Sequence, residues 1–365
     1  MEEVLSGAPS FCLGNGTVSV AVTVRGGHMT ADFDLGGRIV RPYARAPWLP
    51  TEVDESLPVL LTHLRGDFFC LPFGPQREGP PHGETANGEW IREQGAVGEL
   101  RLSMMAEDTK CRVVKSVAIR EHETALYLQH TIEGLRGPWS YGSHPVLDFS
   151  NLADGQGRVS SSAFRWGSVY HGLFSDPKNQ EDQSLLPGGR FESLEKVPML
   201  DGGVADLTRY PAREGFDDLI MIVNESGPSP FAWTACVLDG YVWFCLKDPA
   251  DFPATLFWIS NGGRHSGPWC GLHVKRLGLE EVCSYFCDDV DESRRNLLAD
   301  EGIPTTRSFD GSPVDLRLIQ AVSAVPDEFD IVEHISPSEA GVILLSRSGV
   351  EVEVCLNWKF LNDSP

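Results

Sequence analysis

The sequence predicts a mainly β protein in which antiparallel strands form one large sandwich with few short helices. Two observations support this prediction. Polar and apolar residues alternate with a period of two along many short segments, as they do in strands that bury one face. Turn-forming residues are frequent: 37 glycines and 25 prolines in 365 residues exceed the average share of about 12%. Because strand patterns extend from end to end, we expect one domain over residues 1–365, including the N-terminal strands (1–45) and a C-terminal hairpin (340–358).

The first predicted strands form a hairpin. Valine occupies every second position from 17 to 24, and a second alternating run covers 28–35. Arg25-Gly26-Gly27 separates them, and glycine supplies the positive φ that tight hairpin turns need. Three further strands, separated by polar turns, are predicted at 99–104, 111–119 and 125–132. Together these segments indicate a meander of antiparallel strands.

Between these two sets lies a long segment, 42–90, that is rich in proline, glycine and aromatic residues. Loops of this length in compact proteins are usually functional or disordered, and the aromatic residues argue against disorder. The second half of the chain returns to strands at 219–223, 232–238, 241–246 and 254–259. A final hairpin at 342–346 and 350–356 turns at Ser348-Gly349.

Helices are predicted at only two places. Residues 291–302 begin with a capping residue, Asp291, and end with a stop signal, Gly302. One or two further short helices are expected within 312–325. The sequence therefore predicts a β protein with few helices.

The charge balance excludes some partners. Asp and Glu number 52 against 30 Lys and Arg, for a net charge of −22, which disfavours binding to nucleic acid or to anionic membranes. No apolar run approaches the ~20 residues of a membrane helix, and the acidic start, Met1-Glu2-Glu3, is unlike a secretory signal. Nine scattered cysteines without a CxxC pair favour reduced thiols in a cytoplasmic protein. We expect no metal centre, since the spacing of Cys283 and Cys287 is a weak signal by itself.

Polar residues that could support chemistry gather in three aromatic-rich stretches. The first is 65–84, the second 139–149, and the third 256–281. Signatures of nucleotide-binding loops, serine hydrolases, zinc proteases and calcium loops do not occur.

The order of motifs in these stretches resembles the aldose 1-epimerase (galactose mutarotase) superfamily. The motifs are Arg65, then PFG and PHG ending at Gly74 and Gly83, then His144-Pro145, then Trp258 followed by GGR, PW and GLE. The resemblance covers about 65–281. It implies a β-supersandwich with a sugar-binding cleft on one broad face. It also implies that the protein binds a free sugar or a sugar-like end group and uses no cofactor.

The same resemblance implies roles for individual residues. Glu280 matches the general base, which removes the proton of the anomeric hydroxyl, and His144 matches the acid, which protonates the ring oxygen. We expect these two side chains to face each other across a gap about one monosaccharide wide. The matched substrate-binding residues are His82 and Arg65, with Asp217 or Asp218 contacting sugar hydroxyls. Arg264 and Trp258 are further candidates for substrate binding.

Each of these residues also has an ordinary structural interpretation. His144 could be a half-buried hydrogen-bonding residue and Glu280 a solvated strand end. His82 could be a turn residue, Arg65 could pair with Asp67, and Trp258 could pack in the core.

The chain also departs from the family pattern, which places it among divergent relatives. Glu281, where the family usually has proline, follows Glu280, and Glu84 follows Gly83. Three functions stay open at this point. The protein could interconvert sugar anomers, or bind or sense carbohydrate without catalysis. It could also act as an isomerase or lyase on another sugar derivative, in which case Glu281 or His265 would join the site.

Overall fold

The structure is a computed structural model and describes residues 2–225 and 227–362. Contacts along the chain divide it into two compact units. The first unit takes the residues up to Val146, together with Ala250–Pro253 and Glu280–Leu318. The second takes Leu147–Pro249, Ala254–Leu279 and the residues from Ile319 onward. The expected single domain over 1–365 stays a prediction.

One sheet of the first unit is an N-terminal meander that contains the predicted hairpin. Its strands follow one another in the order β1 (Glu2–Leu5), β2 (Ala8–Gly14), β3 (Val18–Thr23), β4 (Met29–Asp34) and β5 (Ile39–Val40). The predicted hairpin is confirmed: β3 pairs with β4 in antiparallel register, with Val22 opposite Met29. Gly26 and Gly27 in its turn have φ values of 80° and 62°, the left-handed region that glycine tolerates.

The second sheet of this unit contains the three strands predicted after residue 98. Its order is β7 (Ile91–Glu93), β8 (Glu99–Ala106), β9 (Cys111–Ala118), β10 (Ala125–Glu133) and the first part of β26 (Val314–Ala324). Strand β2 lies against β8. Val20 of the first sheet and Leu102 of the second are both buried, as expected where two sheets pack face to face.

The segment 42–90 contains three short elements, α1 (Val59–Thr62), β6 (Phe69–Cys70) and the 3-10 helix η1 (Glu84–Ala86). Its aromatic residues Trp48, Phe68, Phe69, Phe73 and Trp90 are all buried, so the segment is packed, as predicted. The remaining short elements of the first unit, several of which carry site residues, are β11 (Arg136–Trp139), β12 (Tyr141–Ser143), α2 (Val290–Arg294), the 3-10 helix η3 (Ala299–Glu301) and β25 (Arg307–Asp310).

The helix predictions are partly wrong. Instead of one helix over 291–302, α2 is capped by Asp289 and ends at Arg294, and η3 follows it separately. Gly302 does end η3, with φ of 70°. The helices expected within 312–325 do not form, because β26 occupies that range. Leu316 and Leu318 are buried on β26 at a spacing of two, a strand period that the sequence analysis missed.

The second unit is also built from antiparallel strands. One sheet joins β19 (Arg209–Tyr210), β14 (Gly157–Ser161), β21 (Ala232–Val237), β22 (Tyr241–Lys247) and the end of β26. Another joins β16 (Arg190–Phe191), β15 (Phe164–Val169), β20 (Phe216–Asn224), β23 (Ala254–Asn261) and the beginning of β24 (Arg276–Cys283). Strands β20 to β23 confirm the four strands predicted in this half.

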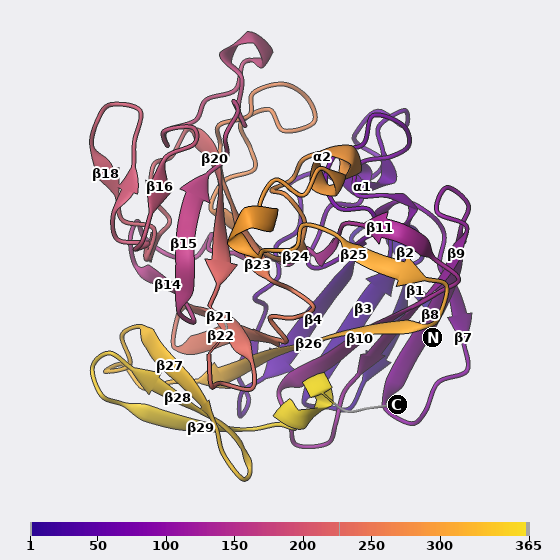
Figure 1. Ribbon diagram of the computed structural model, residues 1–365. Coiled ribbons are helices and arrows are strands. Elements are labelled where there is room, and N and C mark those ends of the chain that lie inside the picture. The colour runs from indigo at the N-terminus through magenta and orange to yellow at the C-terminus, as the bar shows by residue number, and fades with distance from the viewer. Residues whose placement is uncertain (1, 226, 363–365) are drawn as a thin grey trace. The chain divides into compact units, whose positions relative to one another are not determined.

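Smaller elements complete the second unit. They are β13 (Val146–Asp148), which begins at the last residue of the first unit's N-terminal part, the 3-10 helix η2 (Pro177–Asn179), β17 (Val197–Pro198), β18 (Val204–Ala205) and the 3-10 helix η4 (Trp358–Asn362). Strands β27 (Val332–Pro337), β28 (Gly341–Ser346) and β29 (Glu351–Cys355) form a meander, drawn in yellow in Figure 1, and confirm the C-terminal hairpin. Within residues 2–225 and 227–362, no helix has the length and hydrophobicity needed to cross a membrane.

Candidate active site

Three neighbouring strands of the first unit bring the central site residues together. Strand β12 pairs on one side with β6, with Ser143 opposite Phe69, and on the other with β24, with Ser143 opposite Glu281. Continuing both registers by one residue puts His144 between Phe68 and Glu280. The backbone N–H of His144 donates to the carbonyl of Phe68 at 3.0 Å, which confirms this position. Because strand side chains alternate between faces, Phe68, His144 and Glu280 share one face of the sheet.

The imidazole of His144 and the carboxylate of Glu280 are in direct contact. Nε2 of His144 lies 3.2 Å from Oε1 of Glu280, and the two side chains are only 6% and 3% exposed. Glu280 is therefore not a solvated strand end, because it lies in the middle of β24 and is buried. The structure thus joins the two residues that the sequence resemblance matched to an acid and a base.

The expected gap of one monosaccharide between these side chains is wrong. The reason lies in the chemistry of the proposed reaction, since the anomeric hydroxyl and the ring oxygen of a pyranose are attached to the same carbon. An acid and a base that act on these two oxygens must lie near each other, not on opposite sides of a sugar ring. A contact of 3.2 Å fits this requirement.

Aromatic rings enclose His144. The ring of Phe68 stacks on it with centroids 4.5 Å apart, and His82 meets it edge-on at 5.2 Å. Phe73 packs edge-on against His82 at 4.8 Å. His82 comes from the loop before η1, where its backbone has φ of 60°. The resemblance assigns His82 and His144 to one site, and the structure places their rings next to each other, while their roles stay predictions.

Burial keeps these imidazoles neutral. It lowers the pKa of His82 from 6.5 to about 3. The pKa of His144 is also well below 6.5, chiefly because of burial and further because of the neighbouring His82. A neutral imidazole has one N–H, and Nε2 of His144 can direct it at the Glu280 carboxylate.

Asp67 supports the site from the opposite face of the same strands. Its carboxylate accepts hydrogen bonds from the Ser143 hydroxyl at 2.8 Å and from the backbone N–H of His144 at 2.9 Å. Ser143 is paired with Glu281, so Glu281 also points away from the face that carries Glu280. The adjacent carboxylates of β24 thus lie on different faces of the sheet.

Arg65 belongs to the same unit, and its guanidinium is held by backbone carbonyls. It donates to the carbonyls of His63, Leu5 and Ser6 at 3.2, 2.9 and 3.2 Å. The alternative interpretation of an ion pair with Asp67 is wrong, because within the described residues Arg65 forms no such pair. Its role in substrate binding stays a prediction.

The other candidate residues lie in the second unit, in two separate groups. Asp217 accepts hydrogen bonds from the Ser260 hydroxyl at 2.8 Å and the backbone N–H of Gly263 at 2.9 Å, and lies 3.6 Å from Nε of Arg264. Burial raises the pKa of Asp217 despite the nearby Arg264. Asp218, on the other face of β20, instead accepts from the hydroxyl and backbone N–H of Ser184.

Aromatic rings surround Arg264. Its guanidinium lies 5.5 Å from the ring centroid of Trp258, 5.0 Å from that of Trp269 and 4.8 Å from that of Phe174, within the range of cation–π attraction. Trp258 is 6% exposed and stacks on His273 at 5.2 Å. Burial of Trp258 agrees with its core-packing interpretation, and the substrate-binding roles of Asp217, Asp218, Arg264 and Trp258 stay predictions.

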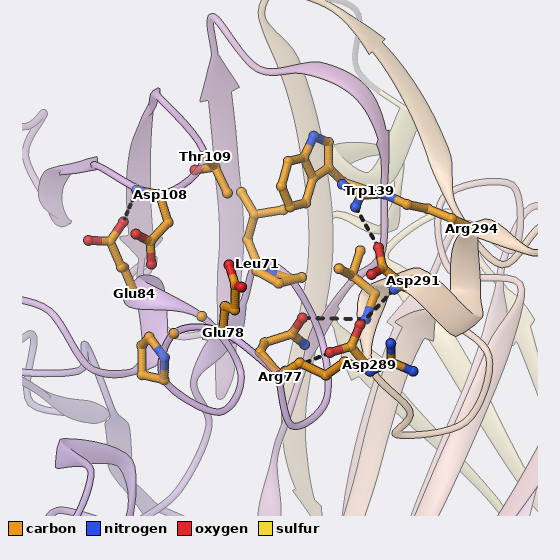
Figure 2. Close-up of a pocket in the computed structure, with 16 residues that line it drawn as sticks. Leu71, Arg77, Glu78, Glu84, Asp108, Thr109, Trp139, Asp289, Asp291 and Arg294 are labelled. Atoms are coloured by element: carbon orange, nitrogen blue, oxygen red, sulfur yellow. Dashed lines mark hydrogen bonds and ion pairs between the residues drawn. The ribbon is translucent and has the colours of Figure 1, made fainter.

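A pocket of about 540 Å³ in the first unit borders the loop that carries His82 (Figure 2). Leu71, Pro80 and Gly83 line it, but His82, His144 and Glu280 do not. Its wall includes Trp139, whose ring is covered by the guanidinium of Arg294 at 4.4 Å. Sequence analysis did not predict this pocket, because its lining comes from segments far apart in the chain.

Three residues of the site were not identified as contributors from the sequence. Asp67 and Phe68 fall within the stretch 65–84 without a role of their own, and His28 begins the predicted strand 28–35, whereas β4 begins one residue later at Met29. His28 stacks on Phe68 at 4.7 Å, on a ring that also stacks on His144. Strand alternation could have indicated which face of its strand Phe68 occupies. Nothing in the sequence, however, shows which strands are adjacent. Among the described residues no cluster of three or more His, Cys, Asp or Glu is arranged to bind a metal ion.

Comparison with known proteins finds likeness in structure and not in sequence. No protein-family model matches the chain, and no curated protein matches it in sequence. A galactose mutarotase related enzyme from Lactobacillus acidophilus superposes with a TM-score of 0.57 at 10% identity, over 87% of this chain and 98% of the other. An Escherichia coli K12 protein provisionally assigned as an aldose 1-epimerase gives 0.58 at 15% identity, over 87% and 99%.

A third solved structure supports the same assignment. A galactose mutarotase-like protein from Lactobacillus casei gives a TM-score of 0.52 at 12% identity, over 86% of this chain and 99% of the other. At these identities the likeness establishes the fold. The resemblance found in the sequence is therefore confirmed at the level of structure: the chain has the galactose mutarotase-like β-sandwich fold of these proteins.

Proposed function

We propose that the protein is an aldose 1-epimerase-like enzyme that interconverts the anomers of a free sugar or a related carbohydrate. The observation that carries this proposal is the 3.2 Å contact between Nε2 of His144 and Oε1 of Glu280. The fold shared with galactose mutarotase-like proteins supports it. The proposed partner is a small carbohydrate.

The contact provides a complete path for protons. In the proposed ring opening, Glu280 takes the proton of the anomeric hydroxyl while the ring oxygen takes the Nε2 proton of His144. The C1–ring oxygen bond breaks, and C1 becomes an aldehyde carbon. Glu280 now holds a proton that His144 lacks, and because their atoms are in contact, this proton passes directly to Nε2. The pair returns to its starting state, and closure on the other face of the aldehyde repeats the steps in reverse.

Burial makes this exchange necessary. Since the pKa of His144 lies well below 6.5, the imidazole carries no spare proton at neutral pH. A histidine that donated to the sugar without recovering a proton from Glu280 would be left as an imidazolate, which is a costly anion in a buried site. Acid–base help of this kind contributes ~10²–10⁴-fold to a rate.

The test is the rate of anomer exchange, measured by NMR magnetisation transfer between the anomeric signals of common aldoses. We expect acceleration over buffer by the native protein and a loss of about 10²-fold or more in Glu280→Gln. The matched control is Glu281→Gln, because Glu281 is equally buried on the same strand but on the opposite face of the sheet. Near-native far-UV circular dichroism of both variants would show that the fold is intact.

Equal loss in both variants would point to damage of β24 and would contradict the specific role of Glu280. No acceleration for any aldose by the native protein would reject the enzymatic function altogether.

The low exposure of the pair also favours a second candidate function, carbohydrate binding without catalysis. Side chains that are 6% and 3% exposed leave a sugar little room to reach both atoms unless neighbouring rings move. Calorimetry would separate the two functions: heat of sugar binding without anomer exchange would favour binding alone.

The proposed location is the cytoplasm, where the nine cysteines, all free thiols in the structure, would remain reduced.

A further inference from the structure

Two arginines of the first unit lie directly opposite each other. Arg45 and Arg65 form an isolated antiparallel bridge, so their side chains start from neighbouring backbone positions. Like charges at such positions are destabilising. Within the described residues neither guanidinium forms an ion pair with a carboxylate. In a chain with a net charge of −22, an unneutralised pair of cations is unexpected.

Of the two arginines, Arg65 has the larger desolvation cost because its side chain is buried. It is 6% exposed, and its three acceptors, the carbonyls of His63, Leu5 and Ser6, are neutral. Burial and the nearby Arg45 lower the pKa of Arg65 from 12.5 to about 10, which still leaves it charged at neutral pH. Buried charges in proteins are normally neutralised by a partner, because an unpaired one pays a desolvation cost that hydrogen bonds alone offset incompletely.

Arg45 and Arg65 line the same small cavity, and the guanidinium groups of both donate to Ser6, another residue of its lining. Its volume is about 120 Å³. The residues that line it are Ser6, Arg45, Ala46, Trp48, Leu49, Thr62, His63, Leu64 and Arg65. Arg45, which is exposed to solvent, reaches this cavity and donates from Nη1 to the Ser6 hydroxyl at 3.2 Å. The side chains that line it include no acidic residue.

The carboxylates around these arginines are engaged elsewhere. Glu52 accepts from the backbone N–H of Leu49 at 2.8 Å, and Glu3 and Asp32 line a separate, wider hollow that Arg45 also borders. Asp32 is already paired with Arg41 at 2.8 Å. None of these carboxylates lines the small cavity, and among the described residues none pairs with Arg45 or Arg65.

We propose that this cavity is a binding site for a small oxyanion of the phosphate class, held between Arg45 and Arg65. A guanidinium has five N–H donors, and Arg65 uses three of them on carbonyls, which leaves two for a ligand. Arginine pairs are suited to tetrahedral oxyanions because planar N–H forks match their oxygens. Bound anion would neutralise the like-charge pair. This site does not rest on the proposed activity, since neither His144 nor Glu280 lines the cavity.

Inorganic phosphate is the first probe, tested by calorimetry and by thermal unfolding of the full chain at constant ionic strength set with chloride. We expect saturable binding and a rise in melting temperature of about 2 °C or more at saturating phosphate. Arg45→Gln should weaken phosphate binding about tenfold. Arg41→Gln is the matched control, because Arg41 is an exposed arginine four residues away that pairs with Asp32 and does not line the cavity. It should bind phosphate like the native chain.

A second readout comes from the repulsion itself. Without phosphate, the melting temperature of Arg45→Gln should equal or exceed that of the native chain, because the variant lacks the repulsion between the two arginines. With saturating phosphate, the native chain should have the higher melting temperature. Comparing inorganic phosphate with a phosphate monoester would distinguish a free anion from the phosphate group of a larger ligand. The proposal would be overturned if phosphate raised the melting temperature no more than chloride, or if Arg41→Gln and Arg45→Gln weakened binding equally.

Discussion

Asp67 holds His144 by the main chain, with 2.9 Å between the backbone nitrogen of His144 and Oδ1 of Asp67. The same carboxylate accepts a hydrogen bond from the hydroxyl of the preceding residue, Ser143. The buried Asp67 carboxylate therefore helps to fix the imidazole of His144 beside Glu280. It does so through the backbone of His144 and does not contact Nε2 of His144 or the Glu280 carboxylate. Asp67 is a positioning residue for the proposed pair.

Replacing Asp67 should weaken both the fold and the site. Asp67→Ala leaves the buried Ser143 hydroxyl without its acceptor, whereas the N–H of His144 keeps the Phe68 carbonyl, and we expect a loss of about 1–3 kcal/mol in the free energy of unfolding. Asp67→Asn keeps one carbonyl acceptor and should lose less. Urea denaturation measures both variants, with Asp34→Asn as control, a change at a half-buried carboxylate at the end of β4 that accepts one N–H of the following turn. If Asp67→Ala were no less stable than the control variant, the proposed clamp would be wrong.

The loop that carries His82 depends on a close backbone approach at Gly83. A Cβ there would lie 2.0 Å from the carbonyl oxygen of Leu71, and the residue has φ of 73°. Gly79 in the same loop has φ of 89°, but its Cβ would meet only the Asp108 carboxylate at 3.2 Å. In both alanine variants the positive φ lowers the free energy of unfolding by about 1 kcal/mol. Only Gly83→Ala must also displace the backbone carbonyl of Leu71.

We therefore expect Gly83→Ala to lose at least about 2 kcal/mol more stability than Gly79→Ala. Thermal unfolding of the two variants in parallel measures this difference. Equal losses would mean that the loop can move away from Leu71 at little cost.

Acid should destabilise the protein through its buried imidazoles. His82 has a folded pKa of about 3 and an unfolded value near 6.5, so between these limits the unfolded chain binds one more proton. The free energy of unfolding then falls as pH decreases, by at most about 1.4 kcal/mol per pH unit for this residue, and is unaffected by it above pH 6.5. His28, with a folded pKa of about 3 because of burial, adds a similar share.

His82→Asn tests this assignment, since asparagine tolerates the positive φ at that position. The variant should show a shallower loss of stability between pH 6.5 and 4 than the native chain, as measured by urea denaturation at several pH values. His334→Asn, at an exposed strand position, is the control and should keep the native slope. An unchanged slope in His82→Asn would show that His82 binds protons equally in both states.

In the second unit, Asp217 should contribute far more to stability than a typical surface carboxylate. It accepts hydrogen bonds from Ser260, Asn261 and Gly263 while fully buried. Asp217→Ala would remove the acceptor of two buried backbone N–H groups, those of Asn261 and Gly263, and should cost about 2–3 kcal/mol. Asp206→Ala, in which a half-exposed carboxylate near Thr208 is lost, should cost less than about 1 kcal/mol. Comparable losses would contradict a structural role for the Asp217 network.

The sequence alone determined the class of the fold, because strand alternation and turn residues are local signals. The hairpin around Gly26 and Gly27 and the last hairpin at Ser348-Gly349 were predicted for this reason. The helix prediction near β26 failed because spacing over a short apolar run does not separate helix from strand when the partner strands are unknown. The motif order around His82, His144 and Glu280 also came from the sequence, through resemblance to a family.

Only the tertiary structure decided which of these residues meet. The contact of His144 with Glu280 depends on β12 pairing with β24, whose residues are more than 130 positions apart, and no local pattern encodes that register. The same holds for Arg45 opposite Arg65, an encounter of two like charges that sequence reasoning had no cause to expect. Local chemistry fixes the strands and turns, whereas the pairing of distant strands follows from burying their apolar faces together, which is a property of the whole chain.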